Sequence, residues 1–102
     1  MEAFRIRKIN QMPRTPRPLC EDGSKNMIGT QVRKARADRR LTLEAVCGRV
    51  ADLTNGRWIP ISQDIYKIES KRRSVTDIEA AALAAALECS IGWLMFGDKA
   101  ES

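Results

Sequence analysis

The chain has 102 residues, of which 43% are hydrophobic and only 5% are aromatic. This length fits one small domain, whose core has to be built mainly from Ile, Leu, Val and Ala side chains. The formal net charge of +5 favours an anionic partner, such as nucleic acid or acidic lipid, over an acidic one. A soluble basic protein without such a partner has the same balance, so charge alone leaves both interpretations open.

The residue types that most catalytic and metal sites require are absent or scattered. The chain has no histidine, and its three cysteines, Cys20, Cys47 and Cys89, lie far apart without a Cys-x-x-Cys spacing. We therefore expect no enzyme activity, no metal site, no other cofactor and no small-molecule ligand. Cys47 and Cys89 stand among apolar residues, which indicates small core side chains in a reducing compartment rather than reactive thiols.

No segment is typical of a membrane span or a signal peptide. The most continuous apolar run, residues 80–87, is too short and too weakly hydrophobic to cross a bilayer. The first ten residues carry charges where a signal peptide has an apolar segment. We therefore expect a cytoplasmic protein without a membrane partner, associated with the nucleoid if it binds DNA.

Residues 1–26 predict a flexible arm. Pro13, Pro16 and Pro18 cluster there, and a short segment with this density of proline cannot hold a helix. The arm carries six basic side chains against three acidic ones, so it can add phosphate contacts or remain a solvated tail. We place the folded domain at residues 27–98 and a C-terminal tail at residues 99–102.

Apolar residues recur at helical spacing from residue 28 onward. One face of the first expected helix comprises Ile28, Val32 and Ala35. Thr42 is the expected N-cap of the second helix, since a threonine oxygen can accept a hydrogen bond from a free backbone N–H. The apolar face of that second helix comprises Leu43, Val46, Cys47 and Val50.

A long link precedes the third expected helix. The pair Asn55-Gly56 marks a turn, and Pro60 excludes a continuous helix through this region. Ser62 is the expected N-cap of the third helix. Ile65 and Ile68 lie one turn apart in it, as they would on a face that packs against the core.

The last two helices have clear start signals. Thr76 and Glu79 have the spacing of a capping box, which opens an alanine-rich helix. The buried stripe of that helix is expected to comprise Ala80, Leu83, Ala84 and Leu87. Ser90 is the expected N-cap of a short final helix that Gly97 ends. Since no segment alternates like a strand, the expected fold is all-α with five helices.

The order and spacing of these elements resemble the phage-repressor-type helix-turn-helix domain, the Xre/Cro-like family. The resemblance runs from residue 28 to residue 97, through IGTQVRKARADRRLTLEAV, IYKIESKRR and TDIEAAALAAALECSIGWLMFG. It implies a five-helix repressor-like domain whose second and third helices form the helix-turn-helix unit, with the third in the DNA major groove. The implied function is transcriptional regulation, most simply repression by a phage or prophage protein.

The resemblance assigns base-facing positions to the third helix, at Ser62, Gln63, Asp64, Tyr66 and Lys67. Glutamine can bond adenine through two hydrogen bonds, lysine can donate to guanine, and aspartate can accept from cytosine. The tyrosine can stack on a sugar or donate to a phosphate. On an isolated helix the same residues would form an ordinary solvated face, so it is the domain pattern that favours DNA.

Contacts to the DNA backbone are implied at two further places. Lys71, Arg72 and Arg73 fall where the family's loop after the third helix meets phosphates, which adds affinity without sequence preference. Thr42 can present its hydroxyl and a helix N-terminus to a phosphate, although capping alone explains this residue equally well.

The resemblance implies a structural role for one pair of charged residues. Arg36 of the first helix and Glu69 of the third are expected to form an ion pair that fixes the angle of the third helix. Trp58, in the long link, is expected to pack on the body of the domain. Its neighbour Arg57 can reach DNA or pack.

Three features depart from the family pattern. The link at residues 54–60 is longer than the usual turn, which puts the docking angle of the third helix in question. Leu43 replaces a polar residue that often contacts the DNA backbone. Lys71 stands where the family usually has a left-handed glycine, so we expect a differently shaped or strained loop.

The expected partners are double-stranded DNA and a second copy of the chain. A single small recognition helix buries little surface, so we expect a homodimer on a roughly palindromic site. The candidate dimer contacts are Trp93, Leu94, Met95 and Phe96. The alternative is that the same fold binds a protein, such as a toxin or a component of the transcription machinery. The polar face of the third helix favours DNA.

Overall fold

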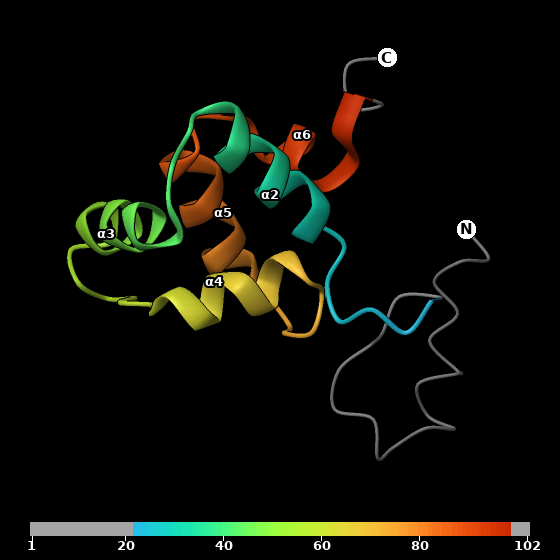
Figure 1. The fold of residues 1–102 in the computed structure, drawn as a ribbon, viewed down its shortest axis with the longest axis horizontal. Helices are drawn as coiled ribbons and strands as arrows, with labels where there is room; N and C mark the ends of the chain where they lie inside the picture. The colour runs from blue at the N-terminus through green and yellow to red at the C-terminus, as the bar shows by residue number, and fades with distance from the viewer. Residues whose placement is uncertain (1–21, 99–102) are drawn as a thin grey trace.

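The computed structural model describes residues 22–98, and within this range the chain forms five helices and no strand (Figure 1). The predicted all-α fold with five helices is confirmed. Most of the predicted arm, residues 1–21, and the predicted tail, residues 99–102, lie outside the described residues. None of the helices in the described range has the length and apolar character needed to cross a membrane. The helices are α2 (Gly29–Asp38), α3 (Leu43–Leu53), α4 (Ser62–Glu69), α5 (Asp77–Ala86) and α6 (Ile91–Phe96).

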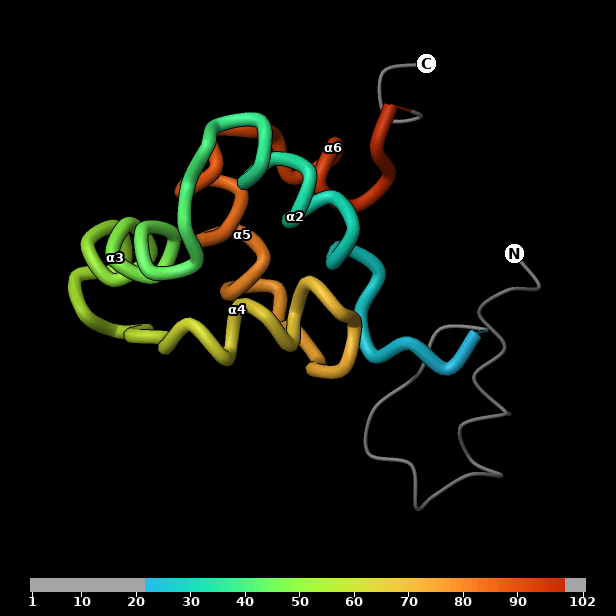
Figure 2. The backbone as a smooth tube through the Cα atoms, in the orientation of Figure 1, coloured from blue at the N-terminus to red at the C-terminus, as the bar shows by residue number. Residues whose placement is uncertain are grey.

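Aliphatic side chains from all five helices form the core. α5 lies between α3 and α6 and packs against both, while α4 packs against α2 and α3 (Figure 2). The predicted alanine-rich stripe of α5 is buried, and its small side chains let the neighbouring helices approach closely. Leu43 and Cys47 are only partly buried, at the edge of the core. The largest fully buried side chains are Ile65, Ile68, Leu83, Leu87 and Leu94.

Three predicted N-caps are confirmed. The Thr42 hydroxyl oxygen accepts a hydrogen bond from the Ala45 N–H at 3.0 Å, and Ser90 does the same for α6. Thr76 and Glu79 form the expected capping box, in which each side chain accepts from the other's backbone N–H at 3.1 Å. These caps depend on residues three positions apart, so the local sequence is enough to specify them.

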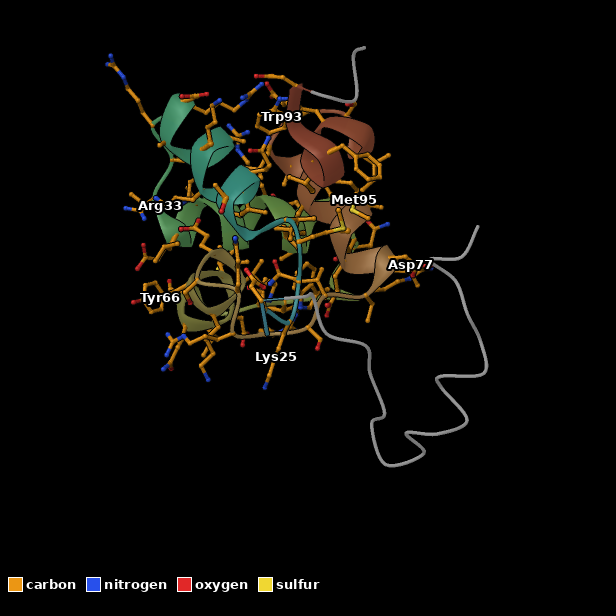
Figure 3. All side chains as sticks on the ribbon, turned by 90° about the vertical axis from the view of Figure 1, so that its right-hand side faces the viewer. Lys25, Arg33, Tyr66, Asp77, Trp93 and Met95 are labelled. Atoms are coloured by element: carbon orange, nitrogen blue, oxygen red, sulfur yellow. The ribbon has the colours of Figure 1, made fainter. Side chains whose placement is uncertain are left out.

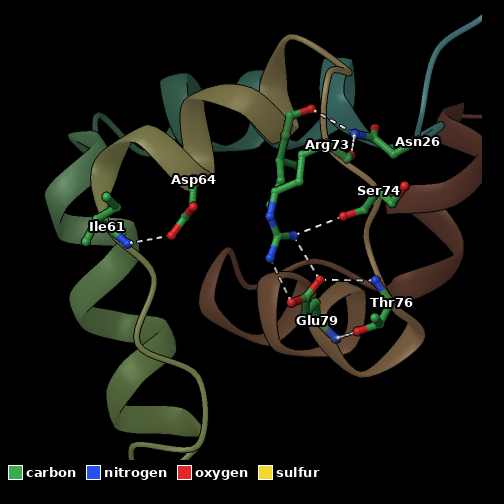
Figure 4. A network of polar contacts seen from close by, with 8 residues as sticks. Asn26, Ile61, Asp64, Arg73, Ser74, Thr76 and Glu79 are labelled. Carbon is green, nitrogen blue, oxygen red and sulfur yellow. Dashed lines mark hydrogen bonds and ion pairs between the residues drawn. The ribbon is translucent and has the colours of Figure 1, made fainter.

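The predicted N-cap of α4 is wrong by one residue. Ser62 is the first helical residue, and Ile61 is the N-cap, with extended backbone angles. The Asp64 carboxylate accepts a hydrogen bond from the Ile61 N–H at 3.0 Å (Figure 4). Because a carboxylate in the first turn satisfies this N–H, the helix can begin without a hydroxyl side chain at its N-cap.

Four helices end in the same way, with a residue other than glycine in the left-handed conformation. Lys71 has a φ of 64°, the left-handed conformation that glycine adopts most easily, so this loop has a steric cost. Its backbone N–H donates to the Ile68 carbonyl, and the next N–H donates to the Lys67 carbonyl. The left-handed residues are Arg40, Asn55, Lys71 and Glu88.

Two arginines serve the fold rather than a binding surface. Arg39, which follows α2, donates to the Glu88 carbonyl, and Arg49 from α3 donates to the Ala86 carbonyl, both at 3.0 Å. These carbonyls lie at the C-terminal end of α5, where cationic groups are favoured by the helix dipole. Part of the positive charge of the chain is therefore explained by structure.

Candidate nucleic-acid interface

α4 lies along the lower edge of the domain in Figure 1, with α2 and α5 above it, α3 at the left and α6 at the top. Ile65 and Ile68 are fully buried, and they anchor α4 to the core. On the other side of the helix, Gln63, Tyr66 and Lys67 are exposed. The period of the apolar residues therefore divides α4 into a packed face and a polar outward face.

The ion pair expected between the first and third helices joins α2 to the end of α4. Arg36 Nε lies 2.6 Å from one oxygen of the Glu69 carboxylate, and Nη2 lies 3.0 Å from the other. Arg36 Nη1 donates to the Leu41 carbonyl at 3.0 Å. The Glu69 side chain is only 6% exposed, and its hydrogen bonds raise the pKa of Arg36. The predicted structural role of this pair is confirmed by its geometry.

Asn26 makes a second connection to the end of α4. Its amide oxygen accepts from the backbone N–H groups of Ile28 and Gly29, which caps the start of α2. Its amide nitrogen donates to the carbonyls of Ile68 and Arg73. Asn26 is buried and the Lys25 N–H donates to the Lys71 carbonyl, so these last two residues of the predicted arm contact the folded body.

The start of α2 and the end of α4 approach each other closely at Gly29. A Cβ atom at this position would lie 2.4 Å from the Ile68 carbonyl oxygen and 2.9 Å from that of Glu69. These distances are too short for any side chain, so this crossing requires glycine. Gly29, Asn26 and the Arg36–Glu69 pair together hold the C-terminal end of α4 in one orientation.

Arg73 has a structural environment that the sequence did not suggest. Its guanidinium donates to both oxygens of the Glu79 carboxylate, at 2.9 and 3.0 Å, and to the Ser74 carbonyl (Figure 4). It also lies 5.7 Å from the centre of the Trp58 ring. The hydrogen bond from Arg73 lowers the pKa of Glu79. Arg73 therefore joins the loop to α5, and its guanidinium is already bound within the protein.

Trp58 packs against the core, as predicted. Its backbone N–H donates to the Thr54 hydroxyl at 3.1 Å, and that hydroxyl lies 3.3 Å from the Trp58 carbonyl. The long link between α3 and α4 is thus held by its own contacts. Arg57, its neighbour, is exposed.

Two of the predicted base-facing residues, Ser62 and Asp64, are partly buried at the start of α4. The Asp64 carboxylate caps the helix, as described above. Ser62 is partly buried, and burial raises the pKa of the Cys47 thiol in α3. These contacts leave Gln63, Tyr66 and Lys67 as the predicted base-facing residues on the outward face.

The other predicted backbone contacts remain accessible. Arg72 is exposed, its guanidinium lies 5.3 Å from the centre of the Tyr66 ring, and its Nε donates to the Ser70 hydroxyl. Lys71 is partly exposed beside it. Thr42 is exposed at the start of α3, where its oxygen accepts the capping bond and its hydroxyl proton can still be donated.

Two open hollows flank α4. One, of about 500 Å³, lies beside Lys25, Lys67 and Arg72, with Arg73 and Glu79 in its wall. The other, of about 310 Å³, is lined by Arg33, Arg36, Tyr66, Glu69 and Ser70. Figure 3 shows Arg33 and Tyr66 on one side of the molecule and Lys25 below them, away from Trp93 and Met95 of α6.

Sequence reasoning missed four residues that form or support this interface. Lys25 and Arg33 add positive charge on either side of α4, and no local pattern marks them. Asn26 and Gly29 position the helix, and both had a weak signal. An asparagine just before a helix is a typical cap, and a glycine in a first turn often marks a close approach.

The predicted dimer contacts divide on burial. Leu94 is fully buried and belongs to the core, so it cannot contact a second copy. Trp93 and Met95 are partly buried against the core, whereas Phe96 is 59% exposed. Ile91, which was not predicted, is 46% exposed on the same short helix.

Comparison of the chain with models of protein families, with curated proteins and with solved structures found no match.

Proposed function

We propose that this protein is a sequence-specific regulator of transcription that places α4 in the major groove of double-stranded DNA. One observation carries the proposal: α4 presents an exposed polar face while its other face is locked to the domain by Arg36–Glu69 and Asn26. A helix that reads bases needs both properties, because its side chains must reach base edges at a fixed angle. The order of the helices, with its resemblance to the Xre/Cro-like domains, supports the same function.

Gln63 and Lys67 have the chemistry for direct base contacts, and both are exposed on α4. The glutamine can pair with adenine and the lysine can donate to guanine. Tyr66 and Arg72 are stacked on each other at 5.3 Å, so they suit contacts to sugar and phosphate beside the groove.

Cationic side chains on both sides of α4 supply non-specific affinity in this proposal. Lys25 and Lys71 lie near one end of the helix, where the Lys25 N–H donates to the Lys71 carbonyl at 3.0 Å. Arg33 lies on the other side, and Thr42 can donate to a phosphate at the start of α3. Each neutralised phosphate releases counterions, so these contacts make binding dependent on salt.

Ser62, Asp64 and Arg73 have supporting roles in the proposal. The Asp64 carboxylate accepts from the Ile61 N–H, Arg73 donates to Glu79, and Ser62 is partly buried. They shape the start of α4 and the loop after it rather than reading bases.

A homodimer is proposed because one short helix offers few base contacts, and paired half-sites double them. The exposed Ile91 and Phe96 on α6 lie at the opposite end of the domain from α4 (Figure 1), which leaves α4 accessible in a dimer. The same exposed pair supports a second candidate function, the binding of another protein through α6. Repression is the simplest regulatory outcome, since a bound dimer would occlude its site.

Selection from a random duplex pool, followed by fluorescence anisotropy, tests the proposal. Gln63→Ala and Lys67→Ala are expected to weaken binding to the preferred duplex by about 1–3 kcal/mol and to change binding to random DNA little. Arg72→Ala is expected to weaken all duplexes alike and to lower the salt dependence by about one ion.

Gln31→Ala is the matched control, because Gln31 also lies on a helix but donates to the Trp93 carbonyl beside α6. It is expected to bind DNA like the parent protein. If the parent shows no preferred duplex, or if the three α4-side variants bind like the parent, DNA reading is refuted. Binding of another protein would then take its place.

A further inference from the structure

The link between α3 and α4 ends in a short extended segment (Figure 2), along which exposed and buried residues alternate. Trp58 is half-buried and Pro60 is buried, so these two face the domain. Ile59 and Ile61 are 70% and 62% exposed and face away from it. This alternation follows from extended backbone, in which successive side chains point in opposite directions.

The two isoleucines are held firmly although they are exposed. Trp58 packs on the core and receives the Arg73 guanidinium over its ring, and Thr54 binds the Trp58 backbone. Ile61 is the N-cap of α4, where Asp64 fixes its N–H. β-branched side chains are also stiff at their first torsion. Little freedom is therefore lost when an apolar group covers them.

We propose that Ile59 and Ile61 contact the C5-methyl groups of thymine bases next to the bases that Gln63 reads. This inference rests on the proposed DNA binding and assigns part of its specificity to the long link. The isoleucines directly precede the exposed face of α4, so they are continuous with the surface that faces DNA. The thymine methyl is the apolar group that the major groove presents.

The surroundings of this pair fit DNA better than a protein partner. The next exposed residues along the chain are Arg57 on one side and Gln63 on the other, a cation and an amide. A stable protein interface needs a larger continuous patch with an apolar centre. Two exposed isoleucines flanked along the chain by a cation and an amide match the mixed chemistry of a base-pair edge.

Uracil substitution tests the proposal, because uracil differs from thymine only in lacking the methyl group. The full chain is used to select a preferred duplex, and each thymine in it is then replaced by uracil in turn. Anisotropy titration gives the dissociation constant of each duplex for the parent, Ile59→Ala and Ile61→Ala. Ile91→Ala is the matched control, an exposed isoleucine on α6 at the far end of the domain.

At least one uracil duplex is expected to bind the parent and Ile91→Ala about fourfold more weakly, the effect of one methyl group. In the variant that lacks the contacting isoleucine, the same uracil duplex and the original duplex are expected to have the same dissociation constant. Ile61→Val, which keeps the branched side chain and the backbone preference, is expected to show a smaller loss of the same sign. Thermal melting of each variant checks that the fold is intact.

Each contrary result identifies what has failed. If no duplex is preferred, the proposed DNA reading fails and takes this inference with it. If a preferred duplex exists but its uracil forms bind like the original, only the inference fails. The inference also fails if the uracil loss persists in both alanine variants, or if both bind the preferred duplex like the parent, as a protein-docking surface would predict.

Discussion

The two ends of α4 are held by different kinds of contact. At the C-terminal end, Asn26 and the Arg36–Glu69 pair connect α4 to α2, and Gly29 allows the two backbones to touch. At the N-terminal end, Asp64 caps the helix through a local contact with Ile61, three residues before it. Ile59 and Ile61 lie exposed there. The polar contacts of one end set the direction of the helix, and the other end is left to present side chains.

The difference suggests that some residues of α4 fix its orientation while others are available to contact a partner. A recognition helix must resist rotation, because a small change of angle at its fixed end displaces every side chain at its free end. It must also leave its reading end uncovered. Substitutions of the residues that join α4 to α2 should therefore change stability, whereas substitutions on the exposed face of α4 should change binding.

Gly29→Ala is expected to have the largest effect on stability, a loss of about 3 kcal/mol, because the new Cβ meets two backbone carbonyls. Gly48→Ala is the matched control, since Gly48 lies in α3 with nothing within 4 Å of an added Cβ. It is expected to gain about 1 kcal/mol from helix propensity. Urea denaturation measures both. Equal stability of the two variants would mean that the ends of α2 and α4 are not tightly packed.

Glu69→Gln is expected to cost about 2 kcal/mol, because it removes a charge from a bidentate hydrogen-bonded pair whose carboxylate is nearly buried. Glu88→Gln provides the comparison, since the Glu88 side chain is 67% exposed and its ion pairs are long, at 3.6 and 3.8 Å. Its effect is expected to stay below about 0.5 kcal/mol. A Glu69→Gln protein as stable as the parent would remove this pair from the contacts that fix α4.

The Arg73–Glu79 pair is expected to make stability fall in acid. The pKa of Glu79 is lowered in the folded protein, so the folded state holds its proton less tightly than the unfolded chain. This contribution is complete above the unfolded-state pKa and is lost as pH falls through the folded-state pKa. Glu79→Gln, which keeps a capping side chain, is expected to be less stable than the parent near neutral pH.

The gap between the parent and Glu79→Gln should close as the pH falls below the ordinary pKa of glutamate. Denaturation at a series of pH values measures it. A gap that stays constant down to the most acidic sample would show that the pair does not couple folding to protonation.

Lys71→Gly is expected to have the smallest effect, a gain of up to about 1 kcal/mol, since glycine adopts the left-handed conformation without steric cost. Lys67→Gly is the control inside α4, where glycine should instead cost about 1 kcal/mol. Melting curves give the sign. A DNA-binding measurement separates the loss of the Lys71 charge from the relief of its strained backbone. The Lys71→Gly protein is expected to be more stable but to bind all duplexes more weakly, because it has lost a phosphate contact.

Sequence patterns alone predicted the helices, the apolar faces and three caps. Thr42, Thr76 and Ser90 cap through bonds to residues three positions away, so their partners are fixed by local spacing. The buried stripe of α5 likewise follows from the period of the helix. The exposed face of α4 was predictable for the same reason. Local patterns can still miss a helix start by one residue. The N-cap of α4 is Ile61 rather than the predicted Ser62, because Asp64 accepts from the Ile61 N–H.

Only the tertiary structure decided which polar side chains remain available for a partner. Asn26 binds a carbonyl 42 residues away, and Arg36 binds a carboxylate 33 residues away. Arg73 looked like a phosphate contact in the sequence, yet a carboxylate and an indole ring hold it in the fold. Such pairings depend on how helices cross and on which groups lose water together. The position of a charged residue in the sequence does not reveal its partner or its burial, because both arise only when distant segments pack.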